Sequence, residues 1–326
     1  MNQAAPLRAW QTFTLLATAN LFWAGNWVVG RALRDVFDPL TLNFWRWLLA
    51  AIFLAPFALP LLKGQWPLLR THAVLLVALA ATGCALFQSL VYIGVSNTTS
   101  VNAVLLSSSA PLFVMLCAWI LERQAASARQ VIGMLVSLAG IAVILARGDP
   151  AGLSQWQIHR GDAWILAAMP VWGLYSVLLR RLPVELRGSV LLFALSALAV
   201  PMLAGPMLAG RAASLSSPMH TGAIAGLGYV ALFASVLAFA CWNRAVAAIG
   251  PSAAGFSLPL MPLFGTVLAI VFLDEDVQGF HGVGIATILL GVALAIWVRK
   301  PRRPDASSVQ RRLSAAPASG RCWPIV

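Results

Sequence analysis

The chain has 326 residues, of which 60% are hydrophobic and only 10% charged, with a mean hydropathy of +0.84 and a formal net charge of +12. A soluble domain carries about a quarter charged residues, and a chain this apolar would expose too much apolar surface to stay in water. The composition excludes an ordinary soluble enzyme and predicts a chain that lies mostly in a bilayer. The basic residues sit between the apolar segments and after the last one, so they indicate membrane topology and no nucleic-acid partner is expected.

Ten segments are apolar enough to cross a bilayer as helices, each of which needs about 20 residues. Long Ala/Leu runs without two-residue alternation favour helices over the strands of a barrel. The predicted fold class is therefore an all-α polytopic membrane protein with ten transmembrane helices. The expected spans are 10–30, 40–62, 73–95, 101–121, 130–147, 162–180, 188–209, 221–243, 253–273 and 280–298.

The first span carries polar and aromatic residues on one helical face. Asn20, Trp23 and Trp27 are spaced i, i+3 and i+7. Polar groups within a span face the bundle interior or a wet cavity, so these three are predicted to bind substrate. Packing between helices, or anchoring at the interface, is the alternative for Trp23. A cleaved signal peptide ending near 17–19 is the less favoured reading, because the apolar run continues well past it.

The second and third spans add an arginine and a polar stripe. Arg46 is expected to snorkel to the membrane surface, with a clamp on a substrate carboxylate as the alternative. Asn26 lies off the first-span face and is expected to bond a neighbouring helix. Cys84, Gln88 and Tyr92 are each four residues apart in the third span. Gln88 and Tyr92 are predicted to bind substrate, because a lone amide in mid-span is costly unless paired or hydrated; an interfacial role competes for Tyr92.

The fourth and ninth spans each contain a Ser- and Pro-rich stretch, "SSSAP" and "SLPLMP". Proline removes a backbone donor and frees a carbonyl one turn earlier, so Pro111, Pro259 and Pro262 are predicted hinges. A simple kink satisfied by the neighbouring serines is the alternative. Glu122 and Glu275 close these two spans and are predicted gate or surface ion-pair groups.

The two halves of the chain repeat one pattern. "LFWAGNWVVGRAL" aligns with "PVWGLYSVLLRRL" at an offset of 149, and the "PLF" motifs of the fourth and ninth spans align at 151. "GMLVSLAG" and "GIATILLG" each place two glycines seven apart, which permits close helix approach. Five spans per half is an odd number, so the second half enters the membrane inverted, as in many secondary transporters. The expected organisation is an N-terminal segment 1–9, repeats 10–147 and 162–298, a connecting loop 148–161 and a basic, disordered tail 299–326.

The repeat extends the predicted site to the second half. In the sixth span the equivalent face holds Met169, Trp172 and Ser176, with Tyr175 beside it, and Phe239 and Asn243 of the eighth span correspond to the third-span stripe. The residues of this half that are also predicted to bind substrate are Trp172, Tyr175, Ser176, Phe239 and Asn243. Packing remains the alternative for Trp172, and an interfacial position the alternative for Asn243.

The motifs also resemble a known family. "FWAGNWVVGRAL" and "FWRW" in spans one and two, "CWNRAVAAIGPSAAGFSLPLMPLFG" at 241–265 and the glutamates of "LERQ" and "LDED" carry the resemblance. The chain resembles the ten-span members of the drug/metabolite transporter superfamily, each half resembling an EamA domain, over about residues 10–298. Asp274 stands where that family usually has glycine. The resemblance implies an inner-membrane transporter of small organic solutes, with export favoured over import.

The predicted function is secondary transport of small neutral or zwitterionic, amino-acid-like metabolites by alternating access. No acidic residue lies deep in a span, and phosphate recognition would need arginine or lysine in the site. No catalytic, nucleotide-binding or metal-binding motif occurs in the sequence, so no enzyme activity and no cofactor is expected. The expected partners are a small-molecule solute and the lipid bilayer, the chain being a monomer or homodimer with both termini in the cytoplasm. The alternatives are a multidrug exporter of lipophilic compounds and a non-transporting membrane sensor or assembly component.

Overall fold

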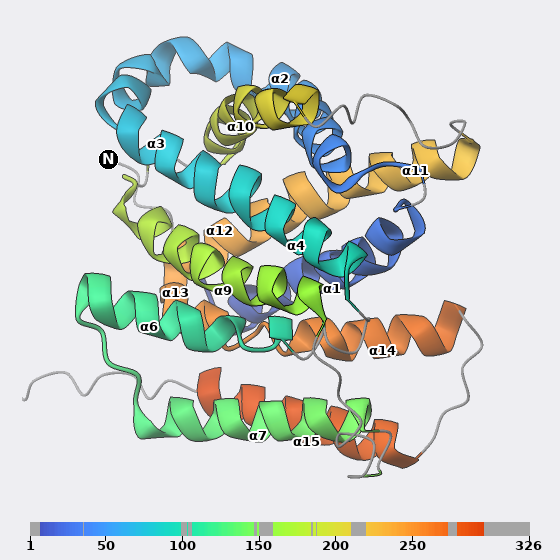
Figure 1. The fold of residues 1–326 in the computed structure, drawn as a ribbon. Helices are drawn as coiled ribbons and strands as arrows, with labels where there is room; N and C mark the ends of the chain where they lie inside the picture. Colours follow the sequence, from blue (N-terminus) through green and yellow to red (C-terminus); the bar gives the residue numbers. More distant parts are fainter. Residues whose placement is uncertain are drawn as a thin grey trace, which may run out of the picture. The chain divides into compact units, whose positions relative to one another are not determined.

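A computed structural model describes residues 7–34, 36–98, 103, 106–146, 149, 159–183, 185–186, 188–209, 220–272 and 279–296, and every regular element in them is a helix (Figure 1). The first half contains α1 (Ala9–Ala32), α2 (Pro39–Thr71), α3 (Ala73–Leu79), η1 (Ala80–Leu86), α4 (Phe87–Ser96), α6 (Ala110–Glu122) and α7 (Ala128–Leu145). The second half contains α9 (Arg160–Leu178), η2 (Leu179–Arg181), α10 (Ser189–Ala209), α11 (Thr221–Tyr229), η3 (Val230–Leu237), α12 (Ala238–Ile249), α13 (Pro251–Gly255), α14 (Leu260–Phe272) and α15 (Gly279–Ile296).

Each of the ten predicted spans falls on one helix or on consecutive helices, which confirms the all-α polytopic fold. The third span runs through α3, η1 and α4, and the eighth through α11, η3 and α12; η1 and η3 are π-helical. The ninth span is divided into α13 and α14. By length and composition alone, five described helical stretches are able to cross a membrane: Pro39–Thr71, Ala73–Ser96, Arg160–Arg181, Ser189–Leu208 and Thr221–Ile249. Shorter apolar helices occupy Ala110–Glu122, Ala128–Ile144 and Gly282–Ala295.

Helix contacts occur in pairs related by the repeat. The first-span helix α1 packs against η3, α12 and α14 of the second half. Its equivalent α9 packs against η1, α4 and α6 of the first half. In the same way α2 contacts η3 while α10 contacts η1, and α2 and α10 pack on each other. The two halves therefore pack against each other through equivalent helices, as two inverted five-helix repeats do.

Among the described helices, α7 and α15, the fifth spans of the two halves, have the most extensive contact, and they lie side by side in Figure 1. A Cβ atom on Gly133 would lie 2.6 Å from the carbonyl oxygen of Gly291, and one on Gly140 would lie 2.8 Å from that of Gly284. Any side chain at these positions would push the backbones apart. The seven-residue glycine spacing seen in the sequence thus has the predicted role in close helix approach.

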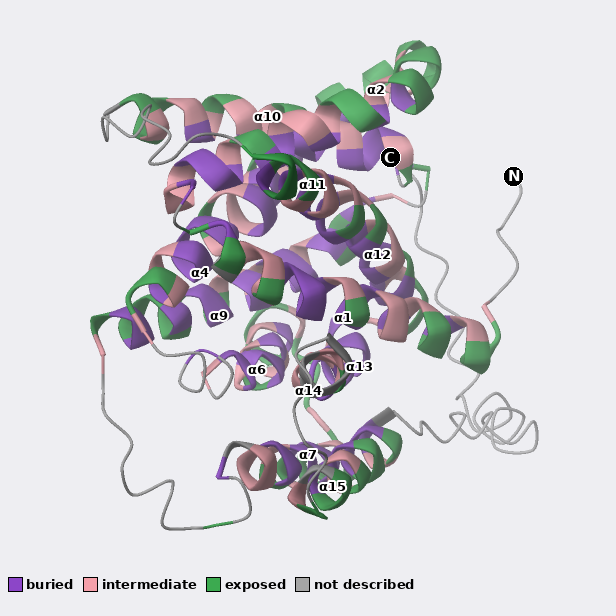
Figure 2. Cartoon of the chain, turned by 90° about the vertical axis from the view of Figure 1, so that its right-hand side faces the viewer, coloured by how far each residue is buried: buried purple, intermediate pink, exposed green. Residues whose placement is uncertain are grey.

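Large apolar side chains cover much of the outside of the helices. Phe57 of α2 is 67% exposed, Leu135 of α7 58% and Val283 of α15 60%. Figure 2 shows how exposed residues alternate with buried ones along α2, α7 and α15, whereas buried residues gather on α4, α9 and α12. A surface this apolar is unfavourable in water and favourable against lipid tails.

Candidate functional site

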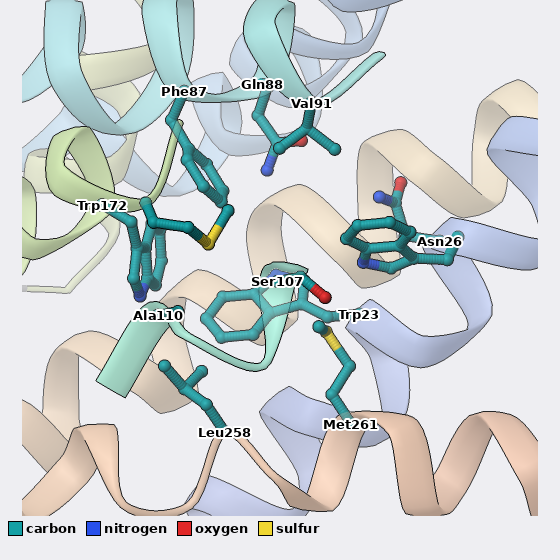
Figure 3. A pocket seen from close by; sticks show the side chains of 12 residues that line it. Trp23, Asn26, Phe87, Gln88, Val91, Ser107, Ala110, Trp172, Leu258 and Met261 are labelled. Atoms are coloured by element: carbon teal, nitrogen blue, oxygen red, sulfur yellow. The ribbon is translucent and has the colours of Figure 1, made fainter. Parts of the chain in front are cut away.

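A pocket lies where the two halves meet (Figure 3). Its cavity volume is about 40 Å³, and it is partly open to the outside. The first, third and fourth spans line it from the first half, and the sixth and ninth from the second half. Its lining residues are Trp23, Asn26, Trp27, Phe87, Gln88, Val91, Ser107, Ala110, Met169, Trp172, Leu258 and Met261.

Three pairs of lining residues are equivalent in the repeat. Trp23 and Trp172 are 149 positions apart, whereas Ser107 and Leu258, like Ala110 and Met261, are 151 apart. These are the two offsets at which the halves align. The pocket therefore lies at the interface of the repeats, where transporters of this architecture hold their solutes.

The polar amide and hydroxyl side chains of the lining all come from the first half, which also contributes Trp23, Trp27, Phe87, Val91 and Ala110. Asn26, Gln88 and Ser107, all from the first half, form what we call the polar wall. The second half contributes the apolar wall, which consists of Met169, Trp172, Leu258 and Met261. Among the described residues, no charged side chain lines the pocket. A small molecule with one polar and one apolar end fits this division.

Gln88 is a lining residue with an oxygen atom that is buried and, within the described part of the chain, unpaired. Its side chain is 4% exposed, and its Oε1 is buried without a hydrogen-bond partner among the described residues. Figure 3 shows the amide of Gln88 directed from α4 into the pocket. A buried amide without partners costs free energy unless a ligand or water bonds to it. Gln88 is thus available to a bound solute.

An aromatic cluster forms the floor of the pocket. Trp23 and Trp172 contact each other and both contact Phe239 and Trp242, with ring centroids 5.1–5.8 Å apart. The ring of Tyr175 is tilted by 30° against that of Trp172, with the centroids 5.2 Å apart. The indole nitrogens of Trp172 and Trp242 are buried without partners in the described part of the chain. Trp23 and Trp172 both line the pocket and pack between helices. The two alternatives that the sequence left open for them are therefore both realised, because each ring contacts the pocket and also the aromatic cluster.

The two π-helices occupy equivalent positions in the repeats and supply backbone acceptors. In η1 the carbonyl oxygen of Cys84 accepts a hydrogen bond from Trp47 Nε1 at 2.8 Å. In η3 the carbonyl oxygen of Ala234 accepts one from Trp23 Nε1 at 3.1 Å. π-helical turns leave carbonyls outside the regular helical ladder and are frequent at functional sites. Here they fix the orientation of two tryptophans, one of which lines the pocket.

The expectation that Arg46 snorkels to the membrane surface is wrong. Its side chain is fully buried. Its Nε donates to Ser235 Oγ at 2.7 Å and its Nη1 to the Tyr92 hydroxyl at 2.9 Å. The guanidinium turns inward because hydrogen-bond acceptors of α4 and η3 lie there, and a buried hydroxyl network replaces the water it would reach by snorkelling.

Asn26 makes both a helix contact and a pocket contact. Its Oδ1 accepts a hydrogen bond from the Tyr92 hydroxyl at 3.1 Å, which confirms the predicted bond between helices. Its side chain also lines the pocket, which the sequence did not predict. Asn26, Tyr92 and Arg46 therefore form a continuous hydrogen-bonded chain that ends at the polar wall.

Of the ten predicted substrate-binding residues, the structure places Trp23, Trp27, Gln88 and Trp172 on the pocket. The others lie behind it. Asn20 Nδ2 donates to Ser257 Oγ at 3.1 Å and so ties α1 to the turn that carries Leu258. The remaining five are buried around the lining. The Tyr92 hydroxyl donates a hydrogen bond to Asn26, and the Tyr175 hydroxyl donates one to Asn243 Oδ1 at 2.8 Å. The Ser176 hydroxyl donates to the Trp172 carbonyl oxygen at 2.9 Å, and Phe239 is part of the aromatic cluster.

The predicted hinge prolines lie at helix starts next to the pocket. Pro111 is the second residue of α6, and Pro262 the third of α14. Pro259 lies in the turn between α13 and α14. Proline at such positions begins a helix without removing a needed donor. The chain is thus broken at both sites, and the breaks place Ser107 and Leu258 on the pocket.

Of the two glutamates predicted as gate or surface ion-pair groups, Glu122 lies in the described part of the chain and Glu275 does not. Glu122 Oε2 pairs with Arg180 Nη1 of η2 at 3.1 Å, with the arginine side chain 38% and the glutamate side chain 16% exposed. Glu275 lies outside the described residues.

Sequence reasoning missed most of the apolar lining. The "SSSAP" and "SLPLMP" stretches were singled out for their prolines, yet Ser107 and Leu258 of the same stretches face the pocket. The offset of 149 places Met169 opposite Asn20 on the sixth-span face, and Met169 lines the pocket although it is not among the residues predicted to bind substrate. The other missed lining residues are Phe87, Val91, Ala110 and Met261.

Comparison with known proteins agrees with this architecture. The EamA-like transporter family matches residues 11–146 and again residues 159–297. The chain is 24% identical over 287 residues to the uncharacterized transporter YyaM of Bacillus subtilis, covering 87% of this chain and 92% of that protein. It is 29% identical over 296 residues to a probable terminal-alkyne amino-acid exporter of Streptantibioticus cattleyicolor, covering 89% and 95%.

A third relative, the uncharacterized transporter YdeK of Bacillus subtilis, is 30% identical over 292 residues, covering 87% of this chain and 94% of that protein. A solved crystal structure has the same fold, with a TM-score of 0.67 and 19% identity over 95% of this chain and 100% of that one. Two family matches, one in each half, account for the repeat, and the pocket lies where the two halves meet. The chain belongs to the EamA-like transporter family and is a multi-pass membrane transporter of small molecules.

Proposed function

We propose that the protein exports small neutral or zwitterionic, amino-acid-like metabolites across the bacterial inner membrane, using the pocket between the repeats as its alternating-access site. The observation that carries this proposal is the position of Gln88. The amide of Gln88, whose buried Oε1 has no hydrogen-bond partner among the described residues, is directed into a pocket that equivalent residues of both halves line. A packed structural core would satisfy that amide or replace it.

The lining supports the proposed substrate class. It offers amide and hydroxyl groups on one wall and thioether, indole and leucine side chains on the other. A phosphorylated solute would be expected to need basic groups in direct contact, and no basic residue in the described part of the chain lines the pocket. The name of the Streptantibioticus cattleyicolor relative, an amino-acid exporter, supports both the solute class and the direction.

The proposal includes a membrane orientation and a division of the chain. Repeats at 10–147 and 162–298 move against each other, with both termini and the basic tail at 299–326 in the cytoplasm. The breaks before α6 and α14 are the flexing points. The pair of Glu122 and Arg180 closes one entrance, because it joins the end of α6 to the end of the sixth span. One chain, alone or as a homodimer, contains the complete pocket.

A second candidate function is export of lipophilic drugs. The apolar wall favours it, since Met169 and Met261 have flexible, polarizable side chains that adapt to different apolar shapes. The polar wall argues for a narrower solute class, because unsatisfied amides penalise a purely apolar ligand.

The test is a profile of the metabolites that accumulate outside bacteria overproducing the protein. Cells carrying the wild type are compared with cells carrying Gln88→Ala and Gln11→Ala. Gln11 is the matched control, because its amide only accepts a bond from the Arg8 backbone at the exposed start of α1. Amino-acid-like solutes are expected outside cells with the wild type and Gln11→Ala, and at least about tenfold less with Gln88→Ala.

Three outcomes would contradict the proposal. Equal accumulation with Gln88→Ala would remove the pocket as the solute site. Resistance to lipophilic drugs without any amino-acid-like solute outside would favour the second candidate. No difference from cells lacking the protein, with the protein confirmed in the membrane, would favour import or a non-transporting role.

A further inference from the structure

A buried arginine without an acidic partner is joined to the polar wall of the pocket. Arg46 is fully buried, and among the residues that the structure describes no carboxylate pairs with it. Its remaining contacts are neutral: its guanidinium carbon lies 5.3 Å from the centre of the Trp47 ring and 5.9 Å from that of Tyr92.

The hydrogen bonds of Arg46 leave donors unused. A guanidinium has five N–H groups. In this structure Nε bonds to Ser235, Nη1 to Tyr92 and Nη2 to the carbonyl oxygen of Ala234 at 3.4 Å. Two N–H groups therefore have no hydrogen-bond partner among the described residues, and the positive charge is faced only by the rings of Trp47 and Tyr92 there. A buried charge is costly unless an opposite charge compensates it, and within a membrane such a residue marks a solute or ion path by default.

The arginine communicates with the pocket through two side chains. Its Nη1 donates to the Tyr92 hydroxyl, and that hydroxyl donates to Asn26 Oδ1 at 3.1 Å. Because Oδ1 accepts this bond, the Nδ2 donor of Asn26 is the group left for the pocket, and Figure 3 shows the amide of Asn26 beside the open space. Gln88 belongs to the same wall, and Figure 3 shows the nitrogen of its amide directed into the same open space. The polar wall thus offers amide donors with a positive charge behind them, which is the arrangement that stabilises an anionic oxygen.

The opposite wall determines how a solute would lie. Leu258 and Met261 are apolar and bond no solute oxygen, so an apolar group fits against them. The faces of Trp23 and Trp27 are available to an ammonium group through cation–π attraction.

We propose that the transported solute is an amphipathic carboxylate, bound with its carboxylate on the Asn26–Gln88 wall in the field of Arg46 and its apolar group against the apolar wall. The inference rests on the proposed function and adds a required charge and a fixed orientation to it. Arg46 acts as a positioning and specificity-determining residue through Tyr92 and Asn26.

The experiment compares acids with amides that differ only in the carboxylate. Full-length protein in lipid nanodiscs is titrated with L-leucine, L-methionine and L-phenylalanine and with the primary amide of each. The wild type is expected to bind at least one acid at least about tenfold more tightly than its amide. Arg46→Met should reduce this acid-to-amide ratio by about tenfold, whereas Arg46→Lys, which keeps the charge, should retain most of it.

Two further variants separate specificity from folding. Arg244→Met, on an exposed position of α12, is the matched control and should keep the wild-type ratio. Tyr92→Phe removes the hydroxyl that links Arg46 to Asn26 and should lower the ratio without removing the charge. If Arg46→Met fails to fold, the wild-type ratio, Arg46→Lys and Tyr92→Phe still decide the question.

A purely structural Arg46 would weaken acid and amide binding equally and leave the ratio unchanged, which would overturn the inference. Preference of the wild type for the amides, or failure to bind any of the acids, would also overturn it. None of these three results excludes the proposed export function, because the extracellular metabolite profile tests that function without reference to the carboxylate.

Discussion

Trp23 and Trp172, which occupy equivalent positions in the two repeats, meet edge to face with ring centroids 5.1 Å apart and ring planes at 90°. Each half thus supplies one of two touching indoles at the floor of the pocket. Such aromatic contacts contribute about 0.5–1.5 kcal/mol beyond the burial of their surface. The pair joins the halves at the place where a solute would separate them.

Trp23→Ala should therefore both loosen the fold and impair transport. It removes ring contacts with Trp172, Phe239 and Trp242 and a bond to the η3 backbone, so about 3–5 kcal/mol of stability should be lost. Thermal unfolding of the detergent-purified protein measures this. Trp66→Ala, at a position 55% exposed, is the control and should unfold like the wild type. Similar unfolding of both variants would show that the aromatic cluster does not hold the halves together.

Gly291→Ala should destabilise the α7–α15 pair. The added Cβ would lie 2.5 Å from the carbonyl oxygen of Gly133, so one backbone must move, at a cost of about 1–3 kcal/mol. Gly282→Ala on the same helix meets no atom within 4 Å and should be neutral or stabilising by about 0.5–1 kcal/mol. Melting temperatures of the two variants give the comparison. A lower melting temperature for Gly282→Ala than for Gly291→Ala would contradict the observed packing.

Exchanging an equivalent pair of lining residues should reveal whether pocket volume limits transport. Ala110→Met places a long side chain into the pocket and should block solute flux, whereas Met261→Ala enlarges it and should admit bulkier solutes. The double variant Ala110→Met/Met261→Ala restores total volume and should recover part of the flux. Flux of the solutes found in the extracellular profile is the measurement. Strictly additive losses in the double variant would exclude a shared cavity.

The ion pair between Glu122 and Arg180 should matter more for transport than for stability. Both side chains are partly exposed, so the pair contributes only about 0–1 kcal/mol to folding. Glu122→Gln and Arg180→Gln should unfold like the wild type while changing the flux, and the swapped Glu122→Arg/Arg180→Glu variant should recover it. Unchanged flux in both single variants would show that the contact is a surface ion pair without a role in transport.

The spans and the glycine pairs could be predicted from the sequence, because both depend on local pattern. About 20 apolar residues are enough to expect a spanning helix, and glycines seven apart share one face whatever lies opposite. The same local pattern indicated Trp23 and Gln88. It could not tell which neighbouring helix covers a given face, so Leu258 was not predicted to line the pocket, and Met169 was placed on the sixth-span face without being predicted to bind.

Two features of the site could not be predicted from local sequence patterns, for physical reasons. An arginine near a span end has the same sequence context whether it reaches the interface or turns inward, and only the acceptors of distant η3 decide the outcome for Arg46. The prediction that Cys84, Gln88 and Tyr92 share one face assumed a regular α-helix, but the chain is π-helical around Cys84, in η1. Cys84 is consequently fully buried and contributes a backbone acceptor, while Gln88 beyond the π-helix reaches the pocket.

The halves are related by a repeat, but the walls they contribute to the pocket are not alike. In an alternating-access cycle the two repeats exchange roles, so a site with identical walls would present the same chemistry to each side of the membrane. A polar wall from one half and an apolar wall from the other present different surfaces in the two states, and the dissociation constants at the two faces need not be equal. Unequal affinities alter how fast each side loads and unloads. They cannot by themselves concentrate a solute, because net accumulation requires a gradient of that solute or of a coupled ion.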